Sequence, residues 1–187
     1  MQFKELSTKA KETAYEQIRW HHSEFLWEVH ELTDEFKWVL DRVGFPTDRI
    51  SWSLGHCQGD GVAFYGHVDL QKYLRWKQPF GTRPDRYYDS DEGFPADFNI
   101  ENWSSYMYHH WNSMTITYED QYTDDTFLEE CREIRDMLDE DTKAMSRALE
   151  KYGYNWIESS TCDEAVEDML LHNPDIFEFD EWGKLVA

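Results

Sequence analysis

The side chains best suited to chemistry gather in residues 56–67, where His56, Cys57, Asp60 and His67 stand close together. A carboxyl group at a loop tip could act as a general acid, and Asp60, between two glycines, fits such a place. An aspartate in this setting is also ordinary turn chemistry, because its side chain bonds to nearby backbone amides. The two histidines flank the turn, so we expect them to approach one another across it. A nucleophilic pair of His56 and Cys57 is excluded, since neighbouring strand residues face opposite sides.

Metal and phosphate sites find little support in the spacing of the other candidate ligands. Two histidine pairs, at 21–22 and 109–110, are adjacent in sequence and so point away from one another on a helix or a strand. The run 89–93 resembles the start of a calcium loop, but Ile100 stands where such a loop requires glutamate. Neither a phosphate-binding glycine loop nor a zinc-peptidase helix motif occurs. We therefore predict no metal, no cofactor and no enzymatic activity.

The element that carries the candidate side chains is predicted to be a β-hairpin over about residues 49–69. Apolar and small polar residues alternate over 50–54, and a second strand-like run covers 62–68. Between them lies the turn sequence Gln58, Gly59, Asp60 and Gly61, in which one glycine is expected to take a positive φ. These four residues are also the candidate ligand site if the hairpin binds a small molecule. The predicted fold class is α+β, a single domain of residues 1–187 with an antiparallel sheet centred on this hairpin and packed helices.

Helical periodicity and capping signals predict the elements around the hairpin. Ser7 caps a first helix, and Gly44 ends a second. Thr126 and Thr161 each open a capping box, the first for a long helix and the second for a short one. The chain leaves the long helix at about Tyr152. The predicted helices cover about 7–18, 23–43, 69–76, 126–151 and 161–172, the further strands 110–118 and 176–179, and an irregular segment 77–103.

Charge sets this chain apart from an average domain. Thirty-nine Asp and Glu stand against eighteen Lys and Arg, a net charge of −21. Phosphate groups would be repelled, so direct binding to nucleic acid or to an anionic membrane is not expected. A protein with a basic surface would be attracted and steered to the chain. A charged face that serves only solubility is the alternative.

The acid is concentrated in the last third of the chain, where residues 121–187 hold nineteen Asp and Glu and six Lys and Arg. We predict that the outer face of the long helix and the C-terminal segment between Lys151 and Lys184 form one anionic surface, whose carboxylates take the positions of phosphates in a duplex. That segment holds nine Asp and Glu and no Lys or Arg. The residues of the long helix are Glu129, Glu130, Glu133, Asp136, Asp139, Glu140 and Asp141, and those of the short helix are Glu164, Glu167 and Asp168.

Cysteine usage and hydropathy indicate the compartment. The three cysteines are scattered and form no disulfide framework, which suits the reducing cytoplasm. No stretch approaches the roughly 18 apolar residues that span a membrane, so insertion into a membrane is not expected.

The hairpin carries a distinctive sequence from Ser53 to Phe64. It resembles a pattern, approximately Ser-Gly-Phe-x-Ser-Gln-Gly-Asp-Gly-Ala-Ser-Phe, of small phage and prophage proteins, some of them labelled antitoxin-like. The segments from Phe3 to Ala14 and from Ser160 to Phe179 are also similar to that family. The resemblance implies a phage or prophage origin, and it supplies no catalytic residues. The chain departs from the pattern at Gly55, His56, Cys57 and Val62.

Charge and resemblance together predict a phage-encoded, non-enzymatic inhibitor in the cytoplasm of a bacterial host. Its partner would be a host protein with a basic surface, for which a nucleic-acid-binding defence protein is the leading expectation. One alternative is an antitoxin or regulator that neutralises a cognate toxin. Another is a small nucleotide- or metal-binding enzyme that uses the hairpin of residues 56–67.

Overall fold

The computed structural model describes residues 1–21, 27–77, 96–103, 111–120 and 125–186. The chain forms two compact units: a terminal unit of Met1–Leu32 with Gly153–Ala187, and a central unit of Thr33–Tyr152. The α+β class and the antiparallel sheet that contains the hairpin confirm the fold class predicted from the sequence. That residues 1–187 behave as one domain stays a prediction.

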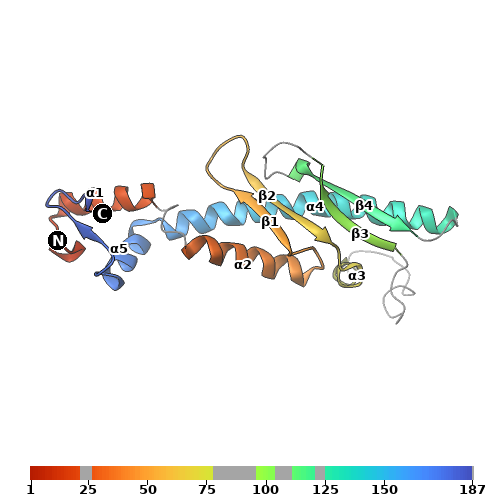
Figure 1. Cartoon of the computed structure of the whole chain (residues 1–187), viewed down its shortest axis with the longest axis horizontal. Helices are drawn as coiled ribbons and strands as arrows, with labels where there is room; N and C mark the ends of the chain where they lie inside the picture. Colours follow the sequence, from red (N-terminus) through yellow and green to blue (C-terminus); the bar gives the residue numbers. More distant parts are fainter. Residues whose placement is uncertain (22–26, 78–95, 104–110, 121–124, 187) are drawn as a thin grey trace. The chain divides into compact units, whose positions relative to one another are not determined.

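Along the chain, two helices precede the first two strands, one helix separates these from the next two strands, and two helices precede the last two strands (Figure 1). No described helix is both long enough and apolar enough to cross a membrane. The helices are α1 (Thr8–His21), α2 (Trp27–Arg42), α3 (Leu70–Lys77), α4 (Asp125–Ser160) and α5 (Asp163–His172).

Four strands form the sheet of the central unit in the order β1-β2-β3-β4, and every neighbouring pair is antiparallel. The first two strands are the arms of the predicted hairpin, and Gly61, with a φ of 150°, opens the second arm. The strands are β1 (Arg49–Ser53), β2 (Gly61–His67), β3 (Ala96–Asn102) and β4 (Met114–Asp120).

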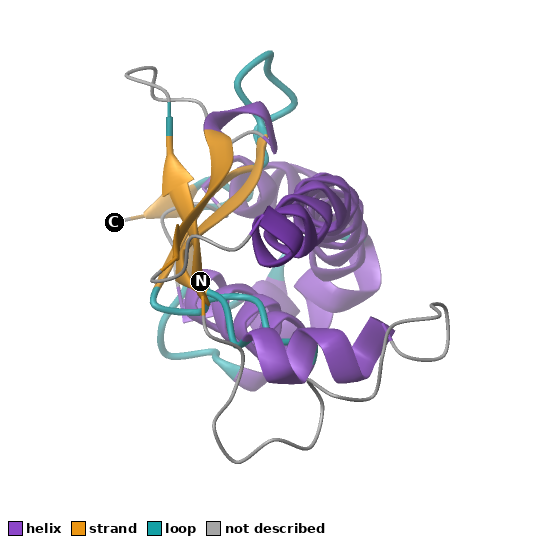
Figure 2. Ribbon diagram, turned by 90° about the vertical axis from the view of Figure 1, so that its right-hand side faces the viewer, coloured by secondary structure: helices purple, strands orange, loops and turns teal. Residues whose placement is uncertain are grey.

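Helices cover one face of this sheet. α4 passes behind the strands in Figure 1, and Figure 2 shows the strands and the helices as separate layers. Ser146 of α4 donates a hydrogen bond to the carbonyl oxygen of Val62 in β2. Phe36 of α2 packs edge-on against Trp52 of β1, with 6.2 Å between the ring centres. In β3, Asp97 and Glu101 point to the other face, which we call the open face, and are exposed, whereas in β2 residues 61–65 are buried on both faces.

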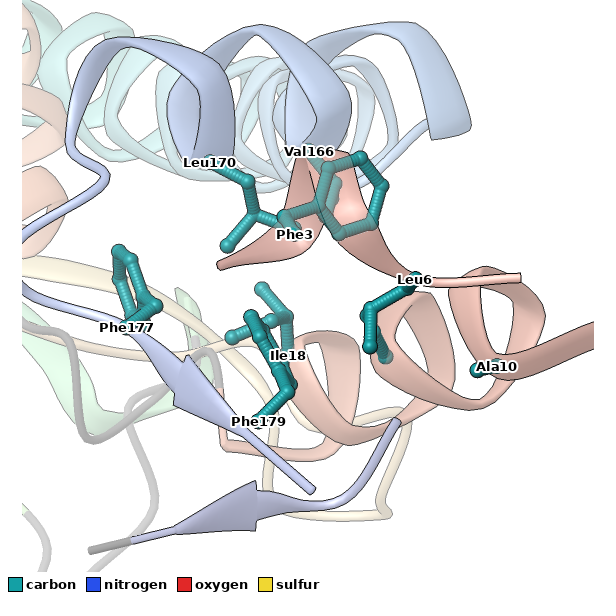
Figure 3. Packing of buried hydrophobic residues seen from close by; sticks show 9 residues of the cluster. Phe3, Leu6, Ala10, Ile18, Val166, Leu170, Phe177 and Phe179 are labelled. Atoms are coloured by element: carbon teal, nitrogen blue, oxygen red, sulfur yellow. The ribbon is translucent and has the colours of Figure 1, made fainter. Parts of the chain in front are cut away.

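The core of the terminal unit joins both ends of the chain (Figure 3). Ala10, Ala14 and Ile18 of α1 recur every four residues and are buried, as their spacing predicts. The N–H of Phe179 donates to the carbonyl oxygen of Met1, and the Met1 amino group donates to the Phe179 carbonyl oxygen at 2.7 Å. A two-stranded sheet of β5 (Glu178–Phe179) and β6 (Leu185–Val186) closes this unit.

Two predicted helix boundaries are confirmed. The Ser7 hydroxyl accepts a hydrogen bond from the N–H of Ala10 at 3.3 Å, which satisfies a donor of the first turn of α1. Gly44 follows α2 with a φ of 83°, and a Cβ there would lie 2.5 Å from the carbonyl oxygen of Asp69. Only glycine avoids both the strained backbone and this overlap.

The strands beyond the hairpin differ from the prediction. The segment predicted as irregular contains β3, in which Ala96, Phe98 and Ile100 are buried at alternate positions. The strand predicted from residue 110 begins only at Met114, because a 3₁₀ turn of Trp111–Ser113 precedes it.

Three predictions about the helices are wrong. Thr126 does not cap the long helix, because it lies inside α4. The chain does not leave that helix at Tyr152, since α4 continues to Ser160. The cap of α5 is Cys162, which makes no side-chain capping bond, and the Thr161 hydroxyl instead donates to the carbonyl oxygen of Ile157 at 2.7 Å.

Candidate partner-binding surfaces

The buried carboxylate of Asp60, 5% exposed, holds the turn of the hairpin. Its Oδ1 accepts hydrogen bonds from Ser53 Oγ at 2.9 Å and from Cys57 Sγ at 3.1 Å, and its Oδ2 accepts one from the N–H of Cys57 at 2.9 Å. Gln58 is exposed at the turn, whereas Gly59 is half-buried. A carboxylate that binds three donors of its own loop fits turn chemistry better than a general acid.

The expectation that His56 and His67 approach one another is wrong. Ser53 pairs with Gly61 next to the turn, whereas His67 pairs with Asn99 at the far end of β2. At about 3.3 Å for each strand residue, the length of β2 separates the two histidines by about 20 Å. The hairpin therefore does not assemble the predicted group of His56, His67 and Asp60.

His67 instead lines an open hollow of about 320 Å³ together with Asp69, Gln71 and Asp97. Asp69 is engaged there, because its Oδ1 accepts a hydrogen bond from the N–H of Lys72 at 3.0 Å at the start of α3. Within the described residues, no group of three His, Cys, Asp or Glu is placed to hold a metal ion. The calcium-loop resemblance at 89–93 lies outside the described residues.

Four acidic side chains form an exposed stripe along α4, which we call the α4 stripe: Glu129, Glu133, Asp136 and Glu140. Steps of three and four residues place them on one side of the helix. The stripe extends over about 16 Å, since each helical residue rises by about 1.5 Å. Along the helix axis the stripe has carboxylates about 5.5 Å apart, whereas each DNA strand has phosphates about 3.4 Å apart. The carboxylates of the stripe are therefore spaced about 1.6 times as widely as the phosphates of a single DNA strand.

The flank of the stripe is less acidic than the sequence suggests. Glu130 and Asp139 are half-buried, and Asp139 is paired with Lys143 one turn further on. Arg135 donates two hydrogen bonds to Asp136, at 2.6 and 3.0 Å. The hydrogen bond to Asp136 raises the pKa of the Arg135 guanidinium further above its ordinary value. Arg135 is therefore always charged and offsets part of the charge of Asp136.

The prediction that Asp141 belongs to this outer face is wrong. Its Oδ2 accepts a hydrogen bond of 2.6 Å from the hydroxyl of Tyr73, a fully buried side chain of α3. The same carboxylate lies 3.0 Å from the ammonium group of Lys77. Asp141 thus satisfies a buried phenol inside the central unit and is not available to a partner.

The predicted carboxylates of α5 belong to the terminal unit, whereas the α4 stripe belongs to the central unit. Glu164 and Asp168 are exposed, and Glu167 is half-buried. Asp168 lies 3.2 Å from the imidazole of His172, with both side chains about 75% exposed. That the two sets join in one continuous surface stays a prediction.

Glu167 is expected to keep Tyr15 protonated to unusually high pH. Burial raises the pKa of the Tyr15 hydroxyl above 10.0, and the charge and hydrogen bond of Glu167 raise it further, while Arg19 lowers it. Because the pKa is higher in the folded state, this contribution to stability is complete below pH 10 and is lost as the pH rises through the folded pKa. Glu167→Gln should move the Tyr15 pKa back toward 10.0. NMR titration of the chain labelled with ¹³C-tyrosine measures this change.

The matched control for this titration is Glu164→Gln, which neutralises an exposed carboxylate on the same helix. It should leave the Tyr15 pKa unchanged, because no contact with Glu164 contributes to it. An equal pKa of Tyr15 in the Glu167→Gln chain and in the unmodified chain would contradict the contact.

No family model matches the chain, and neither a curated protein nor a solved structure matches it. The resemblance to phage and prophage proteins thus rests on the quoted motif residues alone.

Sequence reasoning missed three carboxylates on the open face of the sheet. Asp97 and Glu101 of β3 and Glu119 of β4 are exposed, and Asp97 lies directly opposite Glu119. Like charges at directly opposed positions destabilise a sheet. Apolar residues stand at every second position in this segment, at Ala96, Phe98 and Ile100. This alternation predicts a strand, and it therefore also predicts that the residues between them point outward.

Proposed function

We propose that this chain is a non-enzymatic inhibitor that binds a basic, nucleic-acid-binding protein in place of its nucleic acid. The observation that carries the proposal is the α4 stripe, a row of four exposed carboxylates on one helix of a chain with a net charge of −21. Such a row attracts the cationic groups that otherwise bind phosphates. Its charge density, below that of a DNA strand, favours a competitor that salt displaces readily.

The charge of both units supports attraction over a long range. The terminal unit has fifteen Asp and Glu against five Lys and Arg, and the central unit has twenty-four against thirteen. A basic protein therefore meets a negative potential from either unit, which speeds association at low ionic strength. Specific contacts are then required to hold the complex, because exposed ion pairs contribute only about 0–1 kcal/mol each.

The finer identity of the partner follows from the resemblance of the hairpin. A phage protein of this kind would act in the cytoplasm of the bacterial host against a defence protein such as a nuclease. An antitoxin that neutralises a basic toxin would use the same stripe, so one experiment identifies either partner. The enzymatic alternative has less support from the hairpin, because Asp60 accepts hydrogen bonds from Ser53 and Cys57 and His67 lies at the far end of β2 from the turn.

The test compares the chain with a variant that neutralises the α4 stripe. The tagged chain captures proteins from a bacterial lysate, and the bound proteins are released by a salt gradient and identified by mass spectrometry. We expect a basic nucleic-acid-binding protein. In titrations with that purified protein the variant should bind about 4-fold to 1000-fold more weakly, at about 0.2–1 kcal/mol for each ion pair. The substitutions are Glu129→Gln, Glu133→Gln, Asp136→Asn and Glu140→Gln.

A matched control removes four exposed carboxylates of the terminal unit and so changes the net charge equally. It should bind the partner with nearly unchanged affinity at physiological ionic strength, where distant charges are screened. A stripe variant that folds and binds as tightly as the unmodified chain would contradict the proposal, as would an affinity that is independent of salt. The control substitutions are Glu158→Gln, Asp175→Asn, Glu178→Gln and Glu181→Gln.

A further inference from the structure

β4 is an edge strand whose outward backbone groups meet no described strand. The N–H of Trp103 donates to the carbonyl oxygen of Ser113 at 2.9 Å, so these residues form a hydrogen-bonded pair at the end of the ladder between β3 and β4. In an antiparallel ladder such pairs alternate with pairs whose N–H and C=O groups point away. The N–H and C=O groups of Ile116 and Tyr118 therefore point to the free edge, which is a template for another strand.

A hollow of about 300 Å³ lies beside this edge, between β4 and α4. A strand added to β4 would lie about 4.8 Å away, and its inward side chains would meet this hollow. The charges at its wall are largely paired, Arg135 with Asp136 and Asp139 with Lys143. The inner side thus suits apolar side chains next to Ile116. The residues that line the hollow are Thr115, Ile116, Arg135, Asp136 and Asp139.

The outer side of an added strand would meet negative charge that no described cation offsets. Asp97, Glu101 and Glu119 are exposed on this open face, and none of the three has an ion-pair partner among the described residues. The opposed carboxylates of Asp97 and Glu119 raise the free energy of the sheet. Cationic side chains of an added strand would lower it again.

We propose that the β4 edge binds an extended segment of the partner protein as a fifth strand, with cationic side chains on the open face and apolar side chains toward α4. The inference rests on the proposed function for the sign of the partner's charge, but it places the contact on the backbone of β4. In such additions main-chain hydrogen bonds supply affinity, and alternate side chains supply specificity. A second copy of this chain is disfavoured as the occupant, because it would bring Glu119 and its neighbours to an edge that is already acidic.

The probe is a short synthetic peptide in which lysine and valine alternate, added to the full chain labelled with ¹⁵N. We expect hydrogen exchange at the amides of Ile116 and Tyr118 to slow, because these N–H groups become hydrogen-bonded. Thr117→Lys should weaken peptide binding about fivefold, since it places a cation beside the peptide's lysines. The matched control Ser51→Lys, on the same face at the opposite edge of the sheet, should leave peptide binding unchanged.

A peptide in which glutamate and valine alternate should not bind. Unchanged exchange at Ile116 and Tyr118, or equal binding of the glutamate peptide, overturns the proposal. Slow exchange at both amides without peptide, together with a dimer in analytical ultracentrifugation, also overturns it by assigning the edge to a second copy. Slowed exchange that persists when Glu129, Glu133 and Glu140 are replaced by Gln, with Asp136 of the hollow unchanged, supports the edge independently of the stripe, so docking at the edge and the proposed function fail separately.

Discussion

Gly183→Ala is expected to unfold the terminal unit. Gly183 lies in the turn between β5 and β6 with a φ of 84°, and a Cβ there would overlap the carbonyl group of Ala10 in α1. A left-handed backbone costs an ordinary residue about 1–2 kcal/mol. The overlap adds to this cost, because the carbonyl carbon and oxygen of Ala10 belong to the backbone of α1 and cannot rotate away. We expect a total loss of about 4 kcal/mol or more.

Urea denaturation followed by circular dichroism and by NMR signals of Phe3 and Phe179 measures this loss. Gly55→Ala is the matched control, since its φ is not positive and a Cβ there would have no atom within 4 Å. The control should leave the free energy of unfolding within about 0.5 kcal/mol of the unmodified chain. A Gly183→Ala chain as stable as this control would disprove the packing of the turn against α1.

The same variant tests whether the chain is one domain. If residues 1–187 form a single cooperative domain, the central unit should lose its NMR signals at the same urea concentration as the terminal unit. Persistence of the β1–β4 sheet in a Gly183→Ala chain whose terminal unit is unfolded would contradict the single-domain prediction.

The features that the sequence predicted correctly are those set by neighbouring residues. Ser7 and Gly44 act within one turn of the helices they bound, so their chemistry is visible in a short stretch of sequence. The hairpin is equally local, because a glycine-rich turn joins two strands that pair only with one another at that end. The β3 strand was missed since its partner β4 is more than ten residues away, and its alternation had to be separated from the preceding prolines and glycines.

The incorrect predictions concern contacts that periodicity does not specify. The capping-box pattern at Thr126 occurs equally well inside a helix, because it is short and its residues are good helix surface residues. The acidic character of Asp141 placed it with the exposed carboxylates, yet Tyr73, its partner, stands 68 positions earlier in the chain. Likewise, the sequence placed His56 and His67 near one hairpin but gave no register for its two strands.

Asp60→Ala is expected to destabilise the central unit by about 3 kcal/mol, because three donors of the loop lose a charged acceptor that contributes about 1.5–3 kcal/mol to a hydrogen bond. Asp60→Asn should cost about half as much, since its amide oxygen still accepts from Ser53 or Cys57 while its NH₂ group faces other donors. Urea denaturation measures both losses, and hydrogen exchange at the Cys57 amide reports the loop directly.

The control for Asp60 is Asp41→Asn, which removes an exposed ion pair of 2.8 Å with Lys72 and should cost less than about 0.5 kcal/mol. A comparable loss in the two variants would mean that the Asp60 carboxylate does not hold the turn. A stable Asp60→Asn chain that loses a measurable activity toward a small molecule would restore the enzymatic alternative, because the carboxylate would then serve chemistry at no structural cost. Loss of stability without loss of partner binding is the result expected for a turn that positions β2 and takes no part in the acidic surface.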